Sequence, residues 1–318
     1  MIKIKKTAIV FMLVFLTSQA ALEAQQPEFT PSDSFATMDM ADRSLDVLTK
    51  AEGIEKKEVS KLAEQGLGPM HVYQLATACN DMIIRFEKKK GIRPMPKIVA
   101  APAEYIPEDV KILGGLILAE IRRISNCLRV SDLPQNEEHF SDKTPTDVFG
   151  KMLQVFIKLA SLAGIEKITP SETFQEMTRA VSDVKSILKH IDPAQRYRID
   201  APASGTGMKP ADVFKECLLI RQDINALRKS LNLNVVPVPE LNENRELHPF
   251  DVFIQTQIII AELNLLKMAT GTVSLTPLPV PVSDKVPTDV HQQALMVRYL
   301  LSQIKPLQEM AASAKSEP

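Results

Sequence analysis

The chain has 318 residues, of which 45% are hydrophobic and 24% are charged, with 38 Lys and Arg against 39 Asp and Glu. This composition is that of a globular protein with room for about two domains. It excludes a collagen, a disulfide-dense miniprotein and a strongly basic nucleic-acid binder, and it does not by itself indicate a function.

The first residues predict a secretory signal peptide. A basic start with three Lys precedes an apolar run from Thr7 to Leu16, which is too short to span a bilayer core that needs roughly 20 residues. Small residues allow cleavage after Ala20 or Ala24, and we take 1–24 as the signal peptide.

Removing residues 1–24 takes away three Lys and one Glu, so the net charge changes from −1 to −3. Mild acidity gives no reason to expect nucleic acid or an anionic membrane as partner. The first Cys is Cys79, far from the cleavage region, and no later uncharged run of 18 residues follows, so we expect no lipid anchor and no integral membrane span. The Lys-rich start favours a bacterial periplasm, with secretion to the medium as the alternative.

A helix-start phrase recurs eight times, each time around a proline: Pro31, Pro69, Pro107, Pro145, Pro170, Pro210, Pro249 and Pro287. Proline suits the first helical position, and an acid two residues later meets unpaired N–H groups at the positive end of the helix dipole. The expected capping acids are Asp33, Asp109, Asp147, Glu172, Asp212, Asp251 and Asp289. Where Thr precedes the proline, the pair predicts a capping box.

Apolar residues follow each proline at alternating steps of four and three. After Pro210, for example, they are Val213, Cys217, Ile220, Ile224, Leu227 and Leu231. This spacing predicts eight amphipathic helices of about 20 residues, each about 30 Å long. Burial of one such stripe does not offset the entropy cost of ordering a helix, so the helices must pack on one another.

The prolines stand 38 to 40 residues apart, except for one interval of 25 between Pro145 and Pro170. The segment 141–148 also matches 283–290 with one difference in eight residues. We therefore expect an all-α fold of two tandem, duplicated four-helix units joined by long Pro-rich linkers, the first over 25–167 and the second over 168–318.

The lengths of the linkers limit the directions that consecutive helices can take, and within a unit they leave both the parallel and the antiparallel arrangement open. Most are long enough to run back along a 30 Å helix, so consecutive helices within a unit can be parallel, with straps such as Thr276–Val282 in polyproline form. The short joint Ala163–Thr169 instead predicts that the fourth and fifth helices are antiparallel neighbours. An extra short helix is expected over Glu55–Gln65.

No catalytic phrase, phosphate-binding loop or paired Cys motif is present, so we expect neither an enzyme nor a cofactor. His71, His248 and His291 lie at helix starts and would bind metal only if the fold gathered them. Because no pair has the i, i+4 spacing, we interpret them as solvated capping-region residues and predict no metal site.

Cys79, Cys127 and Cys217 are an odd number for an oxidising compartment. If one disulfide forms, Cys79 with Cys127 is the expected pair, because both lie in the first unit. The alternative is that Cys79 and Cys217, which fall on the apolar stripes, are buried thiols.

Arg221 and Arg298 occupy the same position, eleven residues after the proline, in two helices of the second unit. One interpretation places them at the rim of the buried face. The other has them line a cleft that binds a small anionic ligand or a partner carboxylate.

These features favour an exported, non-enzymatic helical-repeat protein that acts as an interaction or scaffold module, with another envelope or secreted protein as partner. The alternative is a small-molecule binding or sensory helical bundle, in which a ligand lies between helices.

Overall fold

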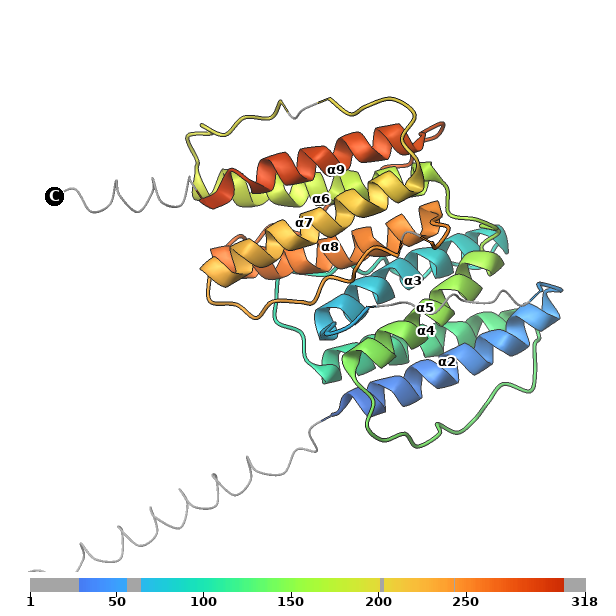
Figure 1. Cartoon of the computed structure of the whole chain (residues 1–318). Helices are drawn as coiled ribbons and strands as arrows, with labels where there is room; N and C mark the ends of the chain where they lie inside the picture. The colour runs from blue at the N-terminus through green and yellow to red at the C-terminus, as the bar shows by residue number, and fades with distance from the viewer. Residues whose placement is uncertain (1–28, 56–63, 201–202, 243, 306–318) are drawn as a thin grey trace, which may run out of the picture.

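The computed structural model describes residues 29–55, 64–200, 203–242 and 244–305, which form eight α-helices and no strand (Figure 1). The helices are α2 (Pro31–Ala51), α3 (Pro69–Lys89), α4 (Pro107–Cys127), α5 (Pro145–Leu162), α6 (Pro170–Ile191), α7 (Pro210–Ser230), α8 (Pro249–Thr270) and α9 (Pro287–Leu301). Each begins at one of the eight prolines, which confirms the predicted all-α fold and its helix starts. The predicted signal peptide 1–24 lies outside the described residues, as does most of the expected helix over Glu55–Gln65.

The same packing pattern occurs twice along the chain. The first unit comprises α2 to α5, in which α2 and α3 each pack against both α4 and α5. The second unit comprises α6 to α9, in which α6 and α7 each pack against both α8 and α9. Figure 1 shows the two units as separate groups of helices, one above the other.

The helices of a unit run parallel. In the second unit, the first prolines of all four helices line one narrow gap at the same end: Pro170, Pro210, Pro249 and Pro287. In the first unit, the Ser34 hydroxyl at the start of α2 donates to the Pro107 carbonyl at the start of α4, at 2.9 Å. The corresponding hydroxyl of Thr173 donates to the Pro249 carbonyl at 3.2 Å. The long linkers therefore act as the expected straps that return the chain to the starting end.

Acidic side chains cap the N-termini of seven helices, and a histidine caps the eighth. Seven carboxylates accept a hydrogen bond from the backbone N–H three residues earlier, at 2.8–3.0 Å: Asp33, Asp109, Asp147, Glu172, Asp212, Asp251 and Asp289. In α3 the Nδ1 atom of His71 accepts the equivalent bond from Gly68 at 2.9 Å. Each acid thus pairs a donor that would otherwise lack an intrahelical partner.

We expect these caps to make stability depend on pH. Hydrogen bonds from the N–H and the hydroxyl of Thr144 lower the pKa of Asp147 below its ordinary value of 3.8. A carboxyl with a lowered folded-state pKa contributes stability that is present above its unfolded-state pKa and is lost as pH falls through the folded-state pKa. Asp147→Asn should therefore lower the free energy of unfolding by about 0.3–1 kcal/mol near neutral pH, and the deficit should shrink below about pH 4.

Urea unfolding at a series of pH values measures this deficit. The exposed linker acid Glu138 is the control, because Glu138→Gln removes a charge away from any helix start. The ion pair of Glu138 with Arg43 is solvent-exposed and should contribute little stability. A deficit for Asp147→Asn that stays constant down to acid pH would show that the carboxylate does not act as a charged cap.

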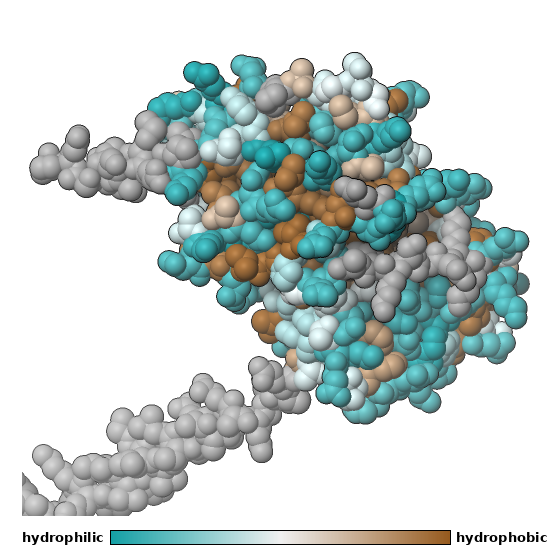
Figure 2. Space-filling model, viewed as in Figure 1, coloured by the Kyte–Doolittle hydropathy of each residue, from teal (hydrophilic) through white to brown (hydrophobic). Residues whose placement is uncertain are grey.

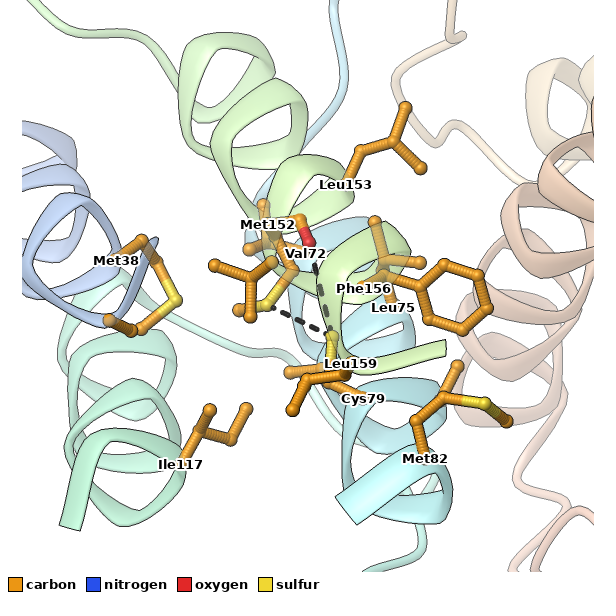
Figure 3. Close-up of a cluster of buried hydrophobic side chains, with 14 of the residues drawn as sticks. Met38, Val72, Leu75, Cys79, Met82, Ile117, Met152, Leu153, Phe156 and Leu159 are labelled. Carbon is orange, nitrogen blue, oxygen red and sulfur yellow. Dashed lines mark hydrogen bonds between the residues drawn. The ribbon is translucent and has the colours of Figure 1, made fainter. Parts of the chain in front are cut away.

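Each unit contains an apolar core built from the predicted stripes. In the first unit, Leu75 and Cys79 of α3, Met152 and Phe156 of α5 and Ile117 of α4 are fully buried (Figure 3). The second core joins α6, α7, α8 and α9 in the same way. The two cores are not fully separate, because Phe253, Ile254 and Ile258 of α8 pack into the first one.

Helix α8 is the central helix of the molecule, and it is buried on nearly every side. By length and composition it is the one described helix that could cross a membrane, but 83% of its apolar window is buried inside the protein. It also carries the buried charges Glu262 and Lys267. Helix α3 of the first unit packs along it, which joins the units.

The prediction that the fourth and fifth helices are neighbours is wrong. Helix α5 packs on α2 and α3, whereas α6 packs on α8 and α9. The reason is that the stripe of α6, with Met177, Ala180 and Val184, faces the second core. The joint after α5 therefore passes the chain from one unit to the other and does not form a helical hairpin.

Candidate functional site

A cleft of about 650 Å³ lies where the two units meet. Its walls come from both units: the C-terminal half of α5, the joint 163–169, the strap 239–248 and the first turns of α8. Phe214 of α7 and Glu64 of the linker before α3 complete the lining. Its volume is within the range of small-molecule sites.

The walls of the cleft are mostly apolar. Phe156 of α5 stacks on Phe250 and Phe253 at the start of α8, with ring centroids 6.4 and 5.4 Å apart. Phe156 and Phe250 line the cleft together with Ile157 and Ile254. Phe156 and Phe250 thus form part of the cleft wall, and the stacking of the three rings connects the two units.

A group of buried polar side chains forms the inner wall. The Gln255 amide nitrogen donates to Glu64 Oε1 at 2.6 Å. Behind them, Nη1 of Arg221 donates to Glu64 Oε2 at 2.9 Å and to Gln255 Oε1 at 3.0 Å. The Nη2 atom of Arg221 donates to the Pro237 carbonyl at 3.1 Å, which ties the α7–α8 strap to α7. Glu64 and Gln255 thus offer polar atoms to the cleft, while Arg221 holds them in place.

Glu262 lies deeper, on the next turns of α8, and is fully buried. Its Oε1 atom is 3.4 Å from Nε of Arg221 and 3.7 Å from Nε2 of His71. Neither carboxylate oxygen has a hydrogen bond within the described part of the chain. Burial lowers the pKa of the nearby Arg228 guanidinium, and the charge on Glu262 partly offsets this shift. Buried charges of both signs thus meet at the interface between the two units, which we call the junction.

The rim of the cleft carries more acids than bases. Glu166, Glu240, Glu246 and Asp251 line the cleft beside Lys167 and Arg245. Arg245 already pairs with Asp251. The electrostatic environment therefore favours a neutral or cationic group in the cleft over an anionic one.

Arg221 and Arg298, the two predicted ligand residues, lie apart and in different surroundings. Arg221 is 0% exposed and is engaged by carboxylates of its own chain. Arg298 of α9 has 38% of its side chain exposed and pairs with Glu216 and Asp223 of α7 at 3.1 and 2.9 Å. Neither arginine lines the cleft.

The disulfide considered between Cys79 and Cys127 is not formed. All three cysteines are free: Cys79 and Cys217 are buried, and Cys127 is exposed at the end of α4. Cys79 lies midway along α3, where its thiol faces Met152 of α5 (Figure 3). Burial raises the pKa of the Cys217 thiol to about 12 and that of Cys79 further still. The alternative interpretation, buried inert thiols at 79 and 217, agrees with these surroundings.

The three histidines at helix starts do not come together. His71 is buried and faces Glu262, so its interpretation as a solvated residue is wrong. His248 is exposed at the rim of the cleft, and His291 contacts the Ser204 hydroxyl at 2.9 Å. Among the described residues, no group of three His, Cys, Asp or Glu could hold a metal ion.

A second buried ion pair fixes the strap between α8 and α9. Lys267 of α8 pairs with Asp183 of α6, and both are fully buried. The Thr276 hydroxyl of the strap donates to Asp183 at 2.8 Å. Burial raises the pKa of Asp183 and lowers that of Lys267, so each charge depends on the other. This pair holds the strap against the second unit, away from the cleft.

Sequence reasoning missed Glu64, Gln255 and Glu262. The one available signal was the composition of α8, which is apolar around its whole circumference and still contains two Gln and a Glu in its middle. A helix buried on all sides needs partners for such side chains. Neither a protein-family model, nor a curated protein, nor a solved structure matches this chain.

Proposed function

We propose that the protein is a non-enzymatic, exported binding protein that holds a small, largely apolar molecule in the cleft between its two units. The observation that supports this proposal is the cleft itself, about 650 Å³ in volume, with aromatic and aliphatic walls and a hydrogen-bonding inner wall. Because both units supply the walls, a bound molecule would contact both of them.

The chemistry of the walls limits the class of ligand. An apolar body would pack against Phe156, Phe250 and Ile254, and a hydrogen-bond donor on it would reach Glu64. The excess of carboxylates at the rim disfavours an anionic ligand. We therefore expect a neutral or cationic amphipathic molecule.

Native mass spectrometry of the chain purified under mild conditions would show a retained small molecule. The neutral dye N-phenyl-1-naphthylamine serves as a probe, and we expect its fluorescence to rise on binding one equivalent of protein. Ile157→Trp should abolish this rise, because the larger ring fills the cleft from α5. The chain has no Trp, so the introduced indole also reports on its own surroundings.

The matched control is Ile199→Trp, at an exposed position outside the cleft, which should leave dye binding unchanged. Equal dye binding by both variants would refute the cleft as the binding site.

The second candidate function is an interaction module that binds an envelope or secreted protein. Large apolar side chains are exposed along the strap between α8 and α9, including Val273, Leu275, Leu278 and Val280. Figure 2 shows apolar residues gathered over the second unit, while the visible face of the first unit is mostly hydrophilic. A stoichiometric protein partner after mild crosslinking, with no retained small molecule, would favour this function over the first.

A further inference from the structure

An apolar stripe on the outer face of α4 is exposed. Ile112 and Leu116, one helical turn apart, are 58% and 51% exposed, although both are large aliphatic residues. Ala119 continues the stripe and is exposed as well. Gly115 lies between them, and a Cβ atom added there would meet no atom within 4 Å. The stripe is therefore open to solvent in this chain.

The internal duplication shows what kind of surface covers such a stripe. Helix α4 is the third helix of the first unit, and α8 is the third helix of the second. Counted from the first proline, Ile112, Leu116 and Ala119 occupy the same positions as Ile254, Ile258 and Ala261. These α8 residues are 2%, 0% and 0% exposed, because the first unit packs on them.

The α8 stripe is covered by an antiparallel helix. Along the contact, Gln74 of α3 donates to Gln257 of α8 at 2.9 Å, and His71 faces Glu262, so residue numbers rise on one helix as they fall on the other. Helix α7 corresponds to α3 in the second unit, but no large apolar side chain of α7 is exposed. Apart from Met268 of α8, the other exposed large apolar side chains of the described residues lie outside the helices, as on the strap between α8 and α9. The helix face best matched to the α4 stripe is therefore the same stripe on another copy.

We propose that the chain forms a two-fold symmetric dimer through antiparallel packing of α4 on α4, independently of the function of the cleft. A two-fold axis near Gly115 and Leu116 places Ile112 opposite Ala119 of the partner subunit, so that a large side chain meets a small one. The same register places Glu108 opposite Arg123 of the partner subunit and Lys111 opposite Glu120 of the partner subunit. Within one chain Arg123 already pairs with Glu120 and Glu87 and keeps 40% of its side chain exposed, so the contacts across the axis would extend an existing ion-pair group. Two-fold dimers are the commonest closed assemblies, and the charges flanking this stripe are complementary in this register.

Sedimentation equilibrium measures the mass of the assembly. The sample is the protein as purified from cells after any processing, with its N-terminus determined by mass spectrometry. We expect twice the mass of one chain. Leu116→Glu should raise the dissociation constant by about 30-fold or more, because it buries a charge at the centre of the contact. Since residue 116 is exposed in the single chain, the helix content and the urea midpoint of the separated chains should not change.

Val280→Glu is the matched control, because it places the same charge at an exposed apolar position on the α8–α9 strap. It should leave the dimer intact. A chain that is monomeric at all concentrations, a dimer that Leu116→Glu does not weaken, or an open-ended series of larger species would each overturn the proposal.

Crosslinking tests the antiparallel direction. The native thiol of Cys127 is exposed near the C-terminal end of α4, and the proposed register keeps the two copies of Cys127 roughly 35 Å apart. A short bismaleimide should therefore not link the native chains. It should link the variant that combines Leu116→Cys with Cys127→Ser. Efficient linkage through Cys127 in the native dimer would indicate a parallel contact and contradict the proposal.

Discussion

Replacing Arg221 by Met is expected to lower the free energy of unfolding by about 3–5 kcal/mol. The guanidinium is fully buried, and it is the group that pairs with Glu64 and lies beside Glu262, two carboxylates that are themselves buried. Without it, these carboxylates would remain in a region of low polarity without a counter-charge. The loss should appear as a lower midpoint of urea unfolding.

Arg298→Met is the matched control, because it removes the same group from the same position of another helix. Its ion pairs are partly exposed, so we expect a cost below about 1 kcal/mol. Adding Glu64→Leu and Glu262→Leu to Arg221→Met should recover part of the lost stability, because the two unpaired carboxylates are then gone, although Arg228 loses the nearby charge of Glu262. Equal costs for the two arginines would mean that the buried group does not stabilise the junction.

Phe156→Ala is expected to cost about 3–5 kcal/mol. The ring is fully buried in the first core and stacks on Phe250 and Phe253 of the second unit. Its removal would leave a cavity that opens into the cleft and would weaken the contact between the units. Phe174→Ala is the control, because that ring is only partly buried and lies under Lys285 at 4.8 Å.

A double-mutant cycle of Phe156→Ala with Phe253→Ala measures the contact between the units directly. We expect a coupling energy of about 0.5–1.5 kcal/mol. Urea unfolding of the four proteins provides it. Strict additivity would show that the two rings stabilise their own units separately.

The helix starts were predictable because their signal is local. A proline, an acid two residues later and an apolar stripe act within two turns of chain. Seven helices begin where this phrase stands, and α3 begins at a proline with His71 in place of the acid. The duplication was readable from the spacing of the prolines. Linker length permitted the parallel arrangement but did not decide it, because a long linker can also join antiparallel helices. The contacts between helix starts decide it.

The junction between the units was not predictable in the same way. Glu64 stands in the segment Glu55–Gln65, where a short helix was expected, and nothing in that segment indicates a distant partner. Only the folded chain brings Glu64 to Arg221. His71 looks like a solvated cap in the sequence, yet its ring faces Glu262, which is far away along the chain. The short joint after α5 indicates a turn but not the direction in which the chain leaves it. Such contacts depend on how whole units dock.

The four helices of each unit run parallel, and each packs on two others of its unit, which has a consequence for folding. In each unit, only the second and third helices are both consecutive along the chain and packed together, as α3 with α4 and α7 with α8. All other packed helix pairs within a unit are separated along the chain by one or two helices. The average sequence separation between contacting residues is therefore large for a helical protein. We therefore expect folding rates nearer those of mixed α/β domains than those of up-and-down bundles, because most loops must close before their helices gain any contact.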